Sequence, residues 1–296
     1  MSWPFEYPHG DHLPFGGDDC PQVTFADAPT VVLPVPLERT VSYLSGTRLG
    51  PSEILRASSQ LELWDEELGI DVHTQGICTL PEMELPYSDQ VKALAEIQRV
   101  ATTIISLNKF LVTLGGEHSI TPPLVAAAAA HYDDLSILQI DAHADLRDSY
   151  LGNPNSHACA MRRSLDYAPG TQVGIRSLST EEAMIADSLP TTLFYDVKMR
   201  DHANWIEDIV STLRRRVYIT IDCDGLNPAV MPAVGTPEPG GLSWTELIQI
   251  LRLTFREREV IACDVVELCP ISGLAHPNFL CAKLVYKLLT YRLGAP

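Results

Sequence analysis

The chain has 296 residues, of which 46% are hydrophobic, and it carries a formal net charge of −17. This length can bury a large core as one α/β domain or two small ones, while the acidic balance argues against nucleic acid as a partner and favours small cations. No apolar run approaches the roughly 18–20 residues of a membrane-spanning helix, so we expect no membrane partner either.

The first 29 residues are rich in proline, glycine and aspartate. They predict an irregular N-terminal arm, residues 1–29, that lies on the body of the protein or on a neighbouring subunit. The arm lacks the basic and apolar regions of a secretory signal. The seven cysteines are scattered and form no CxxC pair, which is typical of reduced thiols in a cytoplasmic protein.

From residue 30 onward, apolar runs of strand length alternate with segments of helical periodicity. The strand-like runs are rich in β-branched residues without polar alternation, which indicates a parallel sheet covered on both faces. They occupy residues 30–36, 110–114, 135–141, 171–175, 191–196, 217–222 and 260–268. The helical segments occupy residues 88–108, 121–132, 202–216, 243–255 and 277–293, and Ser243 with Glu246 predicts a capping box. We therefore predict one α/β domain over residues 30–296, a three-layer αβα sandwich with a mainly parallel sheet.

Unusual polar residues follow four of these strands. The carboxyl ends of parallel strands meet at one edge of a sheet, so we expect these residues to lie close together. Alternate residues of an extended segment point to one face, so Asp141, His143 and Asp145 should converge, as should Asp222 and Asp224. The complete set is His118, Asp141, His143, Asp145, Asp222, Asp224 and Glu267.

Two histidines and four aspartates in one dry pocket require compensating cations. One divalent ion would leave surplus negative charge, whereas two can be held by bridging aspartates. Such a pair acidifies the water between the ions into a nucleophile near neutral pH. Oxygen-rich coordination with a minority of imidazoles favours manganese over zinc, while nickel, cobalt and iron remain open.

Five motifs of the chain resemble those of the ureohydrolase family of arginases and agmatinases. They are "GGEHS" (115–119), "DAHADLR" (141–147), "SHACAMRR" (156–163), "DCDGLNPAVMPAVGTPEPGG" (222–241) and "DVVELCP" (264–270). Their order and spacing are those of the family, and the resemblance covers about residues 30–293. It implies an arginase-like fold, two Mn²⁺ per subunit, hydrolysis of a guanidino group to an amine and urea, and assembly into homo-trimers or hexamers.

The resemblance also implies a role for each matching residue. The six metal ligands would be His118, Asp141, His143, Asp145, Asp222 and Asp224. Asp145 would in addition orient the attacking water, Glu267 would pair with the guanidinium group, and His157 would transfer a proton to the leaving amine. The chain departs from the family pattern at Glu117, where many members have aspartate; a change beside a ligand can alter metal preference.

The substrate is predicted from the residues after the aspartate motif. Arg147 stands where arginases carry an asparagine, and the "DLR" and "SHACAMRR" versions are similar to those of bacterial and archaeal agmatinases. We therefore expect agmatine, a dication that suits an acidic protein and needs no carboxylate anchor, to be converted to putrescine. N1-aminopropylagmatine, giving spermidine, is the alternative, and guanidinobutyrate, arginine and formiminoglutamate rank lower. Two alternatives lie outside ureohydrolase chemistry: an inactive family member that regulates polyamine enzymes, and a metal-dependent deacetylase.

Overall fold

A parallel sheet forms the centre of the computed structural model, which describes residues 5–86 and 88–294. In this part of the chain the sheet has eight strands in the order β2-β1-β3-β8-β7-β4-β5-β6, and every neighbouring pair is parallel. The strands are β1 (Thr30–Val35), β2 (Ile77–Thr79), β3 (Phe110–Gly115), β4 (Leu135–Ile140), β5 (Gly170–Ile175), β6 (Thr191–Tyr195), β7 (Arg216–Asp222) and β8 (Glu259–Val266). The mainly parallel sheet predicted from the sequence is thus confirmed.

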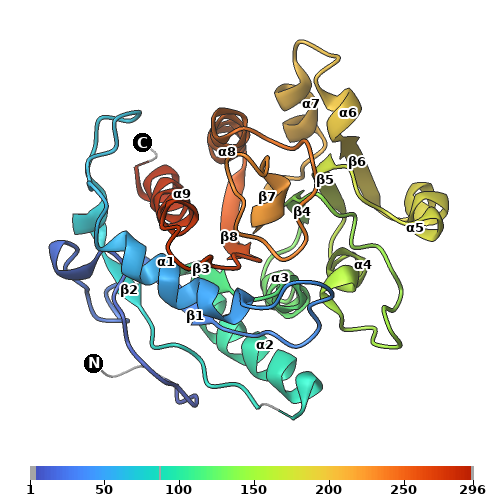
Figure 1. Ribbon diagram of the computed structural model, residues 1–296. Helices are drawn as coiled ribbons and strands as arrows, with labels where there is room; N and C mark the ends of the chain where they lie inside the picture. Colours follow the sequence, from blue (N-terminus) through green and yellow to red (C-terminus); the bar gives the residue numbers. More distant parts are fainter. Residues whose placement is uncertain (1–4, 87, 295–296) are drawn as a thin grey trace.

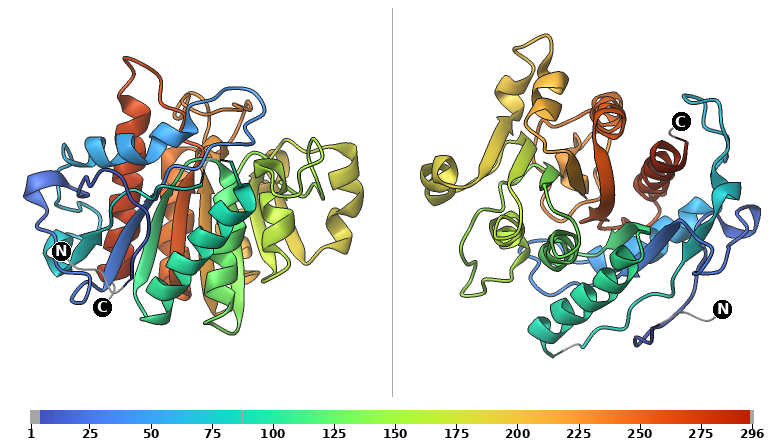
Figure 2. Two further views of the ribbon diagram at one scale, coloured as in Figure 1. Left: turned by 90° about the horizontal axis from the view of Figure 1, so that it is seen from below. Right: turned by 180° about the vertical axis from the view of Figure 1, so that it is seen from behind.

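Helices cover both faces of this sheet (Figures 1 and 2). They are α1 (Gly50–Ser58), α2 (Gln90–Ser106), α3 (Thr121–Ala129), α4 (Ala160–Ser164), α5 (Thr180–Ile185), α6 (Asp196–Met199), α7 (Trp205–Ser211), α8 (Trp244–Glu257) and α9 (His276–Leu293). Buried side chains form two hydrophobic clusters: Val31 and Leu111 pack with α2 and α3, whereas their neighbours Val32 and Val112 pack with α8 and α9. This arrangement confirms the three-layer αβα sandwich.

Local sequence signals explain where several helices begin. The side chain of Asp89 accepts a hydrogen bond from the backbone N–H of Lys92 at the start of α2. The predicted capping box of Ser243 and Glu246 is present at the start of α8. The first turn of α3 contains proline, whose missing N–H is not needed there.

Short elements account for the differences from the predicted pattern. Strand β2 has three residues and the helices α1, α4, α5 and α6 have nine or fewer, too few to show a reliable period. Helix α7 is shorter than the predicted segment 202–216 because turns and irregular backbone occupy residues 202–204 and 212–215, and Arg216 already begins β7. None of the helices in the described part of the chain is long and apolar enough to cross a membrane.

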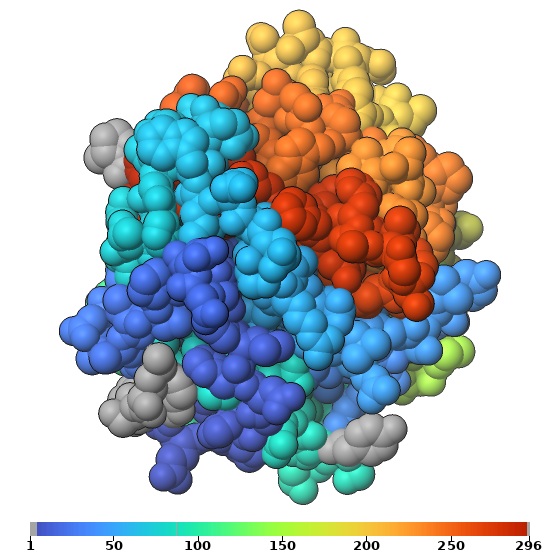
Figure 3. Space-filling view, turned by 60° about the vertical axis from the view of Figure 1, so that its left-hand side comes forward, coloured from blue at the N-terminus to red at the C-terminus, as the bar shows by residue number. Residues whose placement is uncertain are grey.

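Residues 5–29 lie beside β2, the edge strand of the sheet. Figure 3 shows the N-terminal segment on the surface in dark blue. Phe15 and Phe25 are buried, and the backbone N–H of Phe15 donates to Thr79 Oγ1 at 2.9 Å. The N–H of Val23 donates to the carbonyl of Ile77. The described part of the arm therefore packs on the body, while the division of the chain at residue 29 stays a prediction.

Candidate metal centre

The four polar strand ends come together because their strands are neighbours in the sheet. The order β3-β8-β7-β4 places them at its centre. A short 3₁₀ helix, His118–Ile120, follows β3, and another, Cys223–Gly225, follows β7. Strands β4 and β8 lead into Asp141 and Glu267. The same edge of the sheet thus receives every residue of the predicted site on these four strands.

One group of ligand atoms surrounds the imidazole of His118. Its Nδ1 lies 3.2 Å from Asp141 Oδ2, 3.2 Å from Asp145 Oδ2 and 3.3 Å from Asp222 Oδ2. All four side chains are buried. His118, Asp141 and Asp145 are close enough for their ligand atoms to bind one ion.

A second group surrounds His143. Its Nδ1 lies 3.0 Å from Asp224 Oδ2 and 3.7 Å from Asp141 Oδ1. Asp141 therefore belongs to both groups and turns a different oxygen toward each histidine. This is the arrangement expected of a carboxylate that bridges two ions.

Turns rather than an extended backbone bring the aspartates together. Asp145 has a φ of 52°, in the left-handed region, and Asp224 lies in the 3₁₀ turn after β7. The alternation predicted from the sequence is therefore too simple, although the residues do converge. Cys223 points away from the site as expected, with its Sγ 3.5 Å from Cys281 Sγ on α9.

Hydrogen bonds on the side of the ring away from the aspartates fix the orientation of His118. Its Nε2 lies 2.9 Å from Thr220 Oγ1, which donates to Asp264 Oδ1 at 2.6 Å. Because the Thr220 hydrogen points to Asp264, Nε2–H is the donor, and the neutral imidazole that binds a metal ion would carry its lone pair on Nδ1. Nδ1 is buried and has no hydrogen-bond partner, although three carboxylate oxygens lie nearby. A buried lone pair surrounded by carboxylates fits a metal ion.

The charges of the centre are strongly coupled. Burial lowers the pKa of both histidines, but the adjacent carboxylates outweigh it, raising the pKa of His118 well above its usual value and that of His143 to about 12. Burial, followed by the charge of Asp141, raises the pKa of Asp145 to about 6. Burial also raises the pKa of Asp222, followed by the charge of Asp224. Without metal ions, these side chains therefore keep protons that balance part of the negative charge. Divalent ions would supply that positive charge instead.

His157 and Glu267 face each other across a cavity of about 120 Å³ that also reaches His143, Asp145 and Asp224. His157 Nδ1 lies 3.6 Å from Glu267 Oε1, and the same oxygen accepts a hydrogen bond from the backbone N–H of His118 at 2.7 Å. Burial lowers the pKa of His157, but Glu267 outweighs this effect and the pKa is raised. Glu267 reaches this position with a φ of 63°. The structure therefore brings all the predicted site residues to one cavity and its floor.

Arg147 and Tyr150 lie at the entrance of this cavity. The guanidinium of Arg147 stacks over the Tyr150 ring at 5.2 Å, and its Nε lies 3.6 Å from Glu182 Oε2. Glu182 also accepts a hydrogen bond from the backbone N–H of Leu146. The positive charge of Arg147 is therefore compensated at the entrance.

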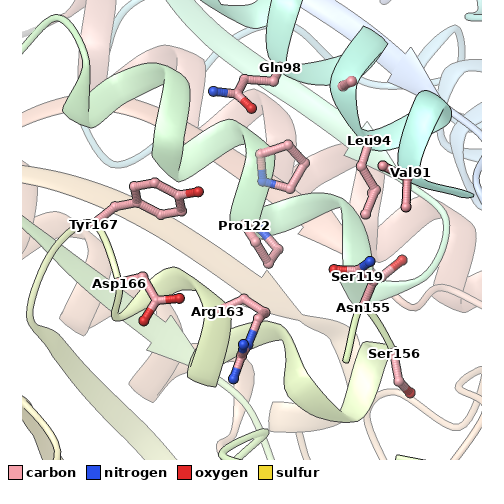
Figure 4. Close-up of a pocket in the computed structure, with 12 residues that line it drawn as sticks. Val91, Leu94, Gln98, Ser119, Pro122, Asn155, Ser156, Arg163, Asp166 and Tyr167 are labelled. Carbon is pink, nitrogen blue, oxygen red and sulfur yellow. The ribbon is translucent and has the colours of Figure 1, made fainter. Parts of the chain in front are cut away.

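A larger cavity of about 320 Å³ lies elsewhere, between α2, α3 and α4 (Figure 4). None of the predicted site residues lines it. Ser119 and Ser156 do, and these are chain neighbours of His118 and His157. The cavity therefore backs the segments that carry the two histidines.

Sequence reasoning gave no role to Thr220 or Asp264. Both lie inside buried strands, β7 and β8, where a threonine is common but an acid is unusual. Asp264 is fully buried and accepts hydrogen bonds from Thr121, Tyr218 and Thr220. The single acid in the run "VIACDVV" was the available signal, but its partners could be known only from the strand order.

Comparisons with known proteins agree with this geometry. The model of the Arginase family matches residues 28–290. The N(1)-aminopropylagmatine ureohydrolase of Synechocystis sp. is 41% identical over 90% of this chain and 90% of that protein, and the agmatinase of Bacillus cereus is 33% identical over 84% and 86%. The solved agmatine ureohydrolase of Thermoplasma volcanium has a TM-score of 0.83 at 34% identity, covering 91% of this chain and 92% of that one. The chain thus belongs to the arginase family and is a ureohydrolase.

Proposed function

We propose that this ureohydrolase removes urea from a guanidine with a cationic amine tail, with two Mn²⁺ ions bound by the two histidine groups. The observation that carries the proposal is Asp141, which turns one oxygen toward His118 and the other toward His143. The proposed ligands are His118, Asp141, His143, Asp145, Asp222 and Asp224. Four carboxylates balance the charge of two divalent ions, and the predominance of oxygen donors supports manganese.

Two divalent ions at this site would supply a water acidified enough to act as a nucleophile near neutral pH. Asp145 reaches the cavity, where its carboxylate can accept a hydrogen bond from the attacking water and orient it. Guanidinium carbon is a poor electrophile, and orientation is therefore a large part of what the protein must provide.

Glu267 is proposed to bind the guanidinium group. Its carboxylate is held by the backbone N–H of His118, so the acid has a fixed position in the cavity. A carboxylate matches the planar fork of guanidinium donors. His157 is proposed to protonate the leaving amine, because it lies in the cavity beside Glu267, whose carboxylate raises the pKa of the ring and favours its protonated form.

N1-aminopropylagmatine is the first substrate to test, and agmatine is the second. Proteins named for the former are 41% and 38% identical to the chain, whereas agmatinases are 31–34% identical. Both substrates have amine tails, which suit an entrance where Arg147 is compensated by Glu182 and a chain with a net charge of −17.

Three further parts of the proposal concern the whole protein. A cytoplasmic location is supported by the seven cysteines, all buried and free of disulfides. Assembly into trimers or hexamers rests on the family resemblance. The single domain over residues 30–296 is supported by the continuous eight-stranded sheet.

The test is urea release from four substrates by the Mn²⁺-loaded protein. The panel is N1-aminopropylagmatine, agmatine, guanidinobutyrate and arginine, with the Asp145→Asn protein as control. We expect the highest kcat/KM with an amine-tailed substrate. Equal turnover of all four would contradict tail recognition, and absence of urea with every substrate and with Mn²⁺, Ni²⁺, Co²⁺ or Fe²⁺ would contradict the proposed function.

A further inference from the structure

The segment before the candidate site is fixed to the segment that carries His118. The backbone N–H of Gly116 donates to the carbonyl of Val35 at 2.9 Å, and that of Glu117 donates to the carbonyl of Leu37 at 2.8 Å. A Cβ on Gly116 would lie only 2.1 Å from the Leu37 oxygen. Glycine is therefore required at 116, because the two backbones touch there.

Glu117 extends this contact with its side chain. Its Oε2 accepts hydrogen bonds from the backbone N–H groups of Arg39 and Thr40, both at 2.6 Å. Its Oε1 accepts from Thr40 Oγ1 at 2.9 Å and from Ser119 Oγ at 2.5 Å. The carboxylate is fully buried. Both the backbone and the hydroxyl of Thr40 are consequently fixed by one side chain.

Thr40 in turn holds His157. The backbone N–H of His157 donates to Thr40 Oγ1 at 2.9 Å. Because the Thr40 hydrogen points to Glu117, the hydroxyl presents a lone pair to His157. His157 begins a short 3₁₀ helix, His157–Cys159, and Ser156 at its N-cap makes no side-chain cap hydrogen bond. Thr40 therefore takes the place of the missing cap.

A cavity lies on the other side of this segment, which is joined to α2 by a hydrogen bond from Gln90 Nε2 to the Asn155 carbonyl. Asn155 and Ser156, which precede His157, line the larger cavity together with Ser119 (Figure 4). The Ser156 hydroxyl is buried without a hydrogen-bond partner. The His157 carbonyl accepts a hydrogen bond from the Ala160 N–H within its own 3₁₀ turn, whereas the hydrogen bond from the His157 N–H to Thr40 Oγ1 ties this backbone to a distant segment of the chain.

We propose that Glu117 and Thr40 are positioning residues, which together set the place of His157 opposite Glu267. The inference rests on the proposed role of His157 as proton donor. It also gives a reason for glutamate at 117, since aspartate is shorter by one C–C bond, about 1.5 Å, and would not reach the backbone of Arg39 and Thr40 from the same position. Glu117 thus acts on the segment before the cavity and, through Thr40, on the proton donor.

The test compares Thr40→Val, which keeps the shape and removes the hydroxyl, with Thr40→Ser, which keeps the hydroxyl. Displacing the proton donor by about 1 Å can lower the rate about 10²-fold. Thr40→Val should therefore lower kcat by up to that factor, with little change in KM. Thr40→Ser should restore most of the loss, and Glu117→Asp should lower kcat in the same way. Thr113→Val is the matched control, because Thr113 is buried in β3 and its hydroxyl has no partner. Equal losses in Thr40→Val and Thr113→Val would overturn the proposal.

A double-mutant cycle separates positioning from general loss of structure. If Thr40 acts through His157, Thr40→Val should cost little in a His157→Ala background, whereas multiplied losses would overturn the proposal. A crystal structure of Thr40→Val gives a readout independent of turnover. In the present structure His157 Nδ1 lies 3.6 Å from Glu267 Oε1. A changed position of the His157 ring in the variant supports the inference, and an unchanged position overturns it. An inactive wild-type protein would instead refute the proposed function. The position of the His157 ring in the Thr40→Val structure would then still decide whether Thr40 positions His157.

Discussion

Metal binding is expected to release at least two protons per subunit at neutral pH. The perturbation is a titration of Mn²⁺ into protein stripped of metal by a chelator. Before binding, the imidazoles of His118 and His143 hold protons, because neighbouring carboxylates raise both pKa values despite burial. A histidine must be neutral to bind a metal ion, so both protons leave when the site fills.

The sign and size of the pH dependence follow from these protons. They are bound in the metal-free protein and absent from the loaded one, so the apparent affinity falls as the pH falls. Two protons lower the product of the two binding constants about 100-fold per pH unit, which corresponds to about 2.7 kcal/mol. Asp145, with a pKa of about 6, adds a third proton below that pH and steepens the dependence toward about 1000-fold per unit.

The assay is isothermal titration calorimetry at pH 7.5 in two buffers of different ionisation enthalpy, combined with chelator competition at several pH values. The exposed His131, which lies outside the site, provides a control: His131→Gln should leave the proton count unchanged. Metal binding without proton release, or with an affinity independent of pH between 6 and 8, would show that His118 and His143 are not charged in the metal-free protein. The charge balance described above would then be wrong.

Three further predictions concern single residues. Asp145→Asn should lower kcat by about 10²–10⁴-fold in the urea-release assay, and an activity close to wild type would exclude it as the orienting acid. Thr220→Val removes the acceptor for His118 Nε2–H and should weaken metal binding about 10–100-fold in chelator competition; an unchanged affinity would show that the hydroxyl does not orient the ligand. Lys287→Met leaves the fully buried Asp65, 2.7 Å from Lys287 Nζ, without its cation and should lower the free energy of unfolding by about 3–5 kcal/mol in chemical denaturation. A loss below about 1 kcal/mol would mean that Asp65 is neutralised in another way.

The layers of the fold were predictable because most strands of the central sheet are mainly apolar and rich in β-branched residues. All seven predicted strands are present, and β2 was missed since its three residues depend on pairing with β1. The same reasoning located the site, because residues that follow parallel strands arrive at one edge whatever the strand order. The order itself was not predictable. Only the structure shows that β3, β8, β7 and β4 are neighbours.

The details of the site required three-dimensional information for a different reason. Alternation along an extended chain places side chains on a face, but it does not predict a left-handed residue such as Asp145 or Glu267. Non-glycine residues adopt that conformation at a cost, which surrounding contacts must offset. For Glu267 the hydrogen bond from the His118 backbone is one such contact. Strain of this kind comes from tertiary structure and leaves no local pattern in the sequence.

Asp264 lies in the interior of the sheet but affects the orientation of His118 at the edge of the sheet. An acid in the middle of a buried strand costs free energy unless its oxygens are fully hydrogen-bonded, and three hydroxyl groups donate to this one. The arrangement turns the Thr220 lone pair toward His118 and therefore turns His118 Nδ1 toward the carboxylates. Replacing Asp264 by an apolar residue would free the Thr220 hydrogen to rotate toward His118 Nε2 and favour the tautomer that places a proton on Nδ1. The buried acid is thus best understood as selecting the metal-binding form of the histidine, at some expense to the stability of the core.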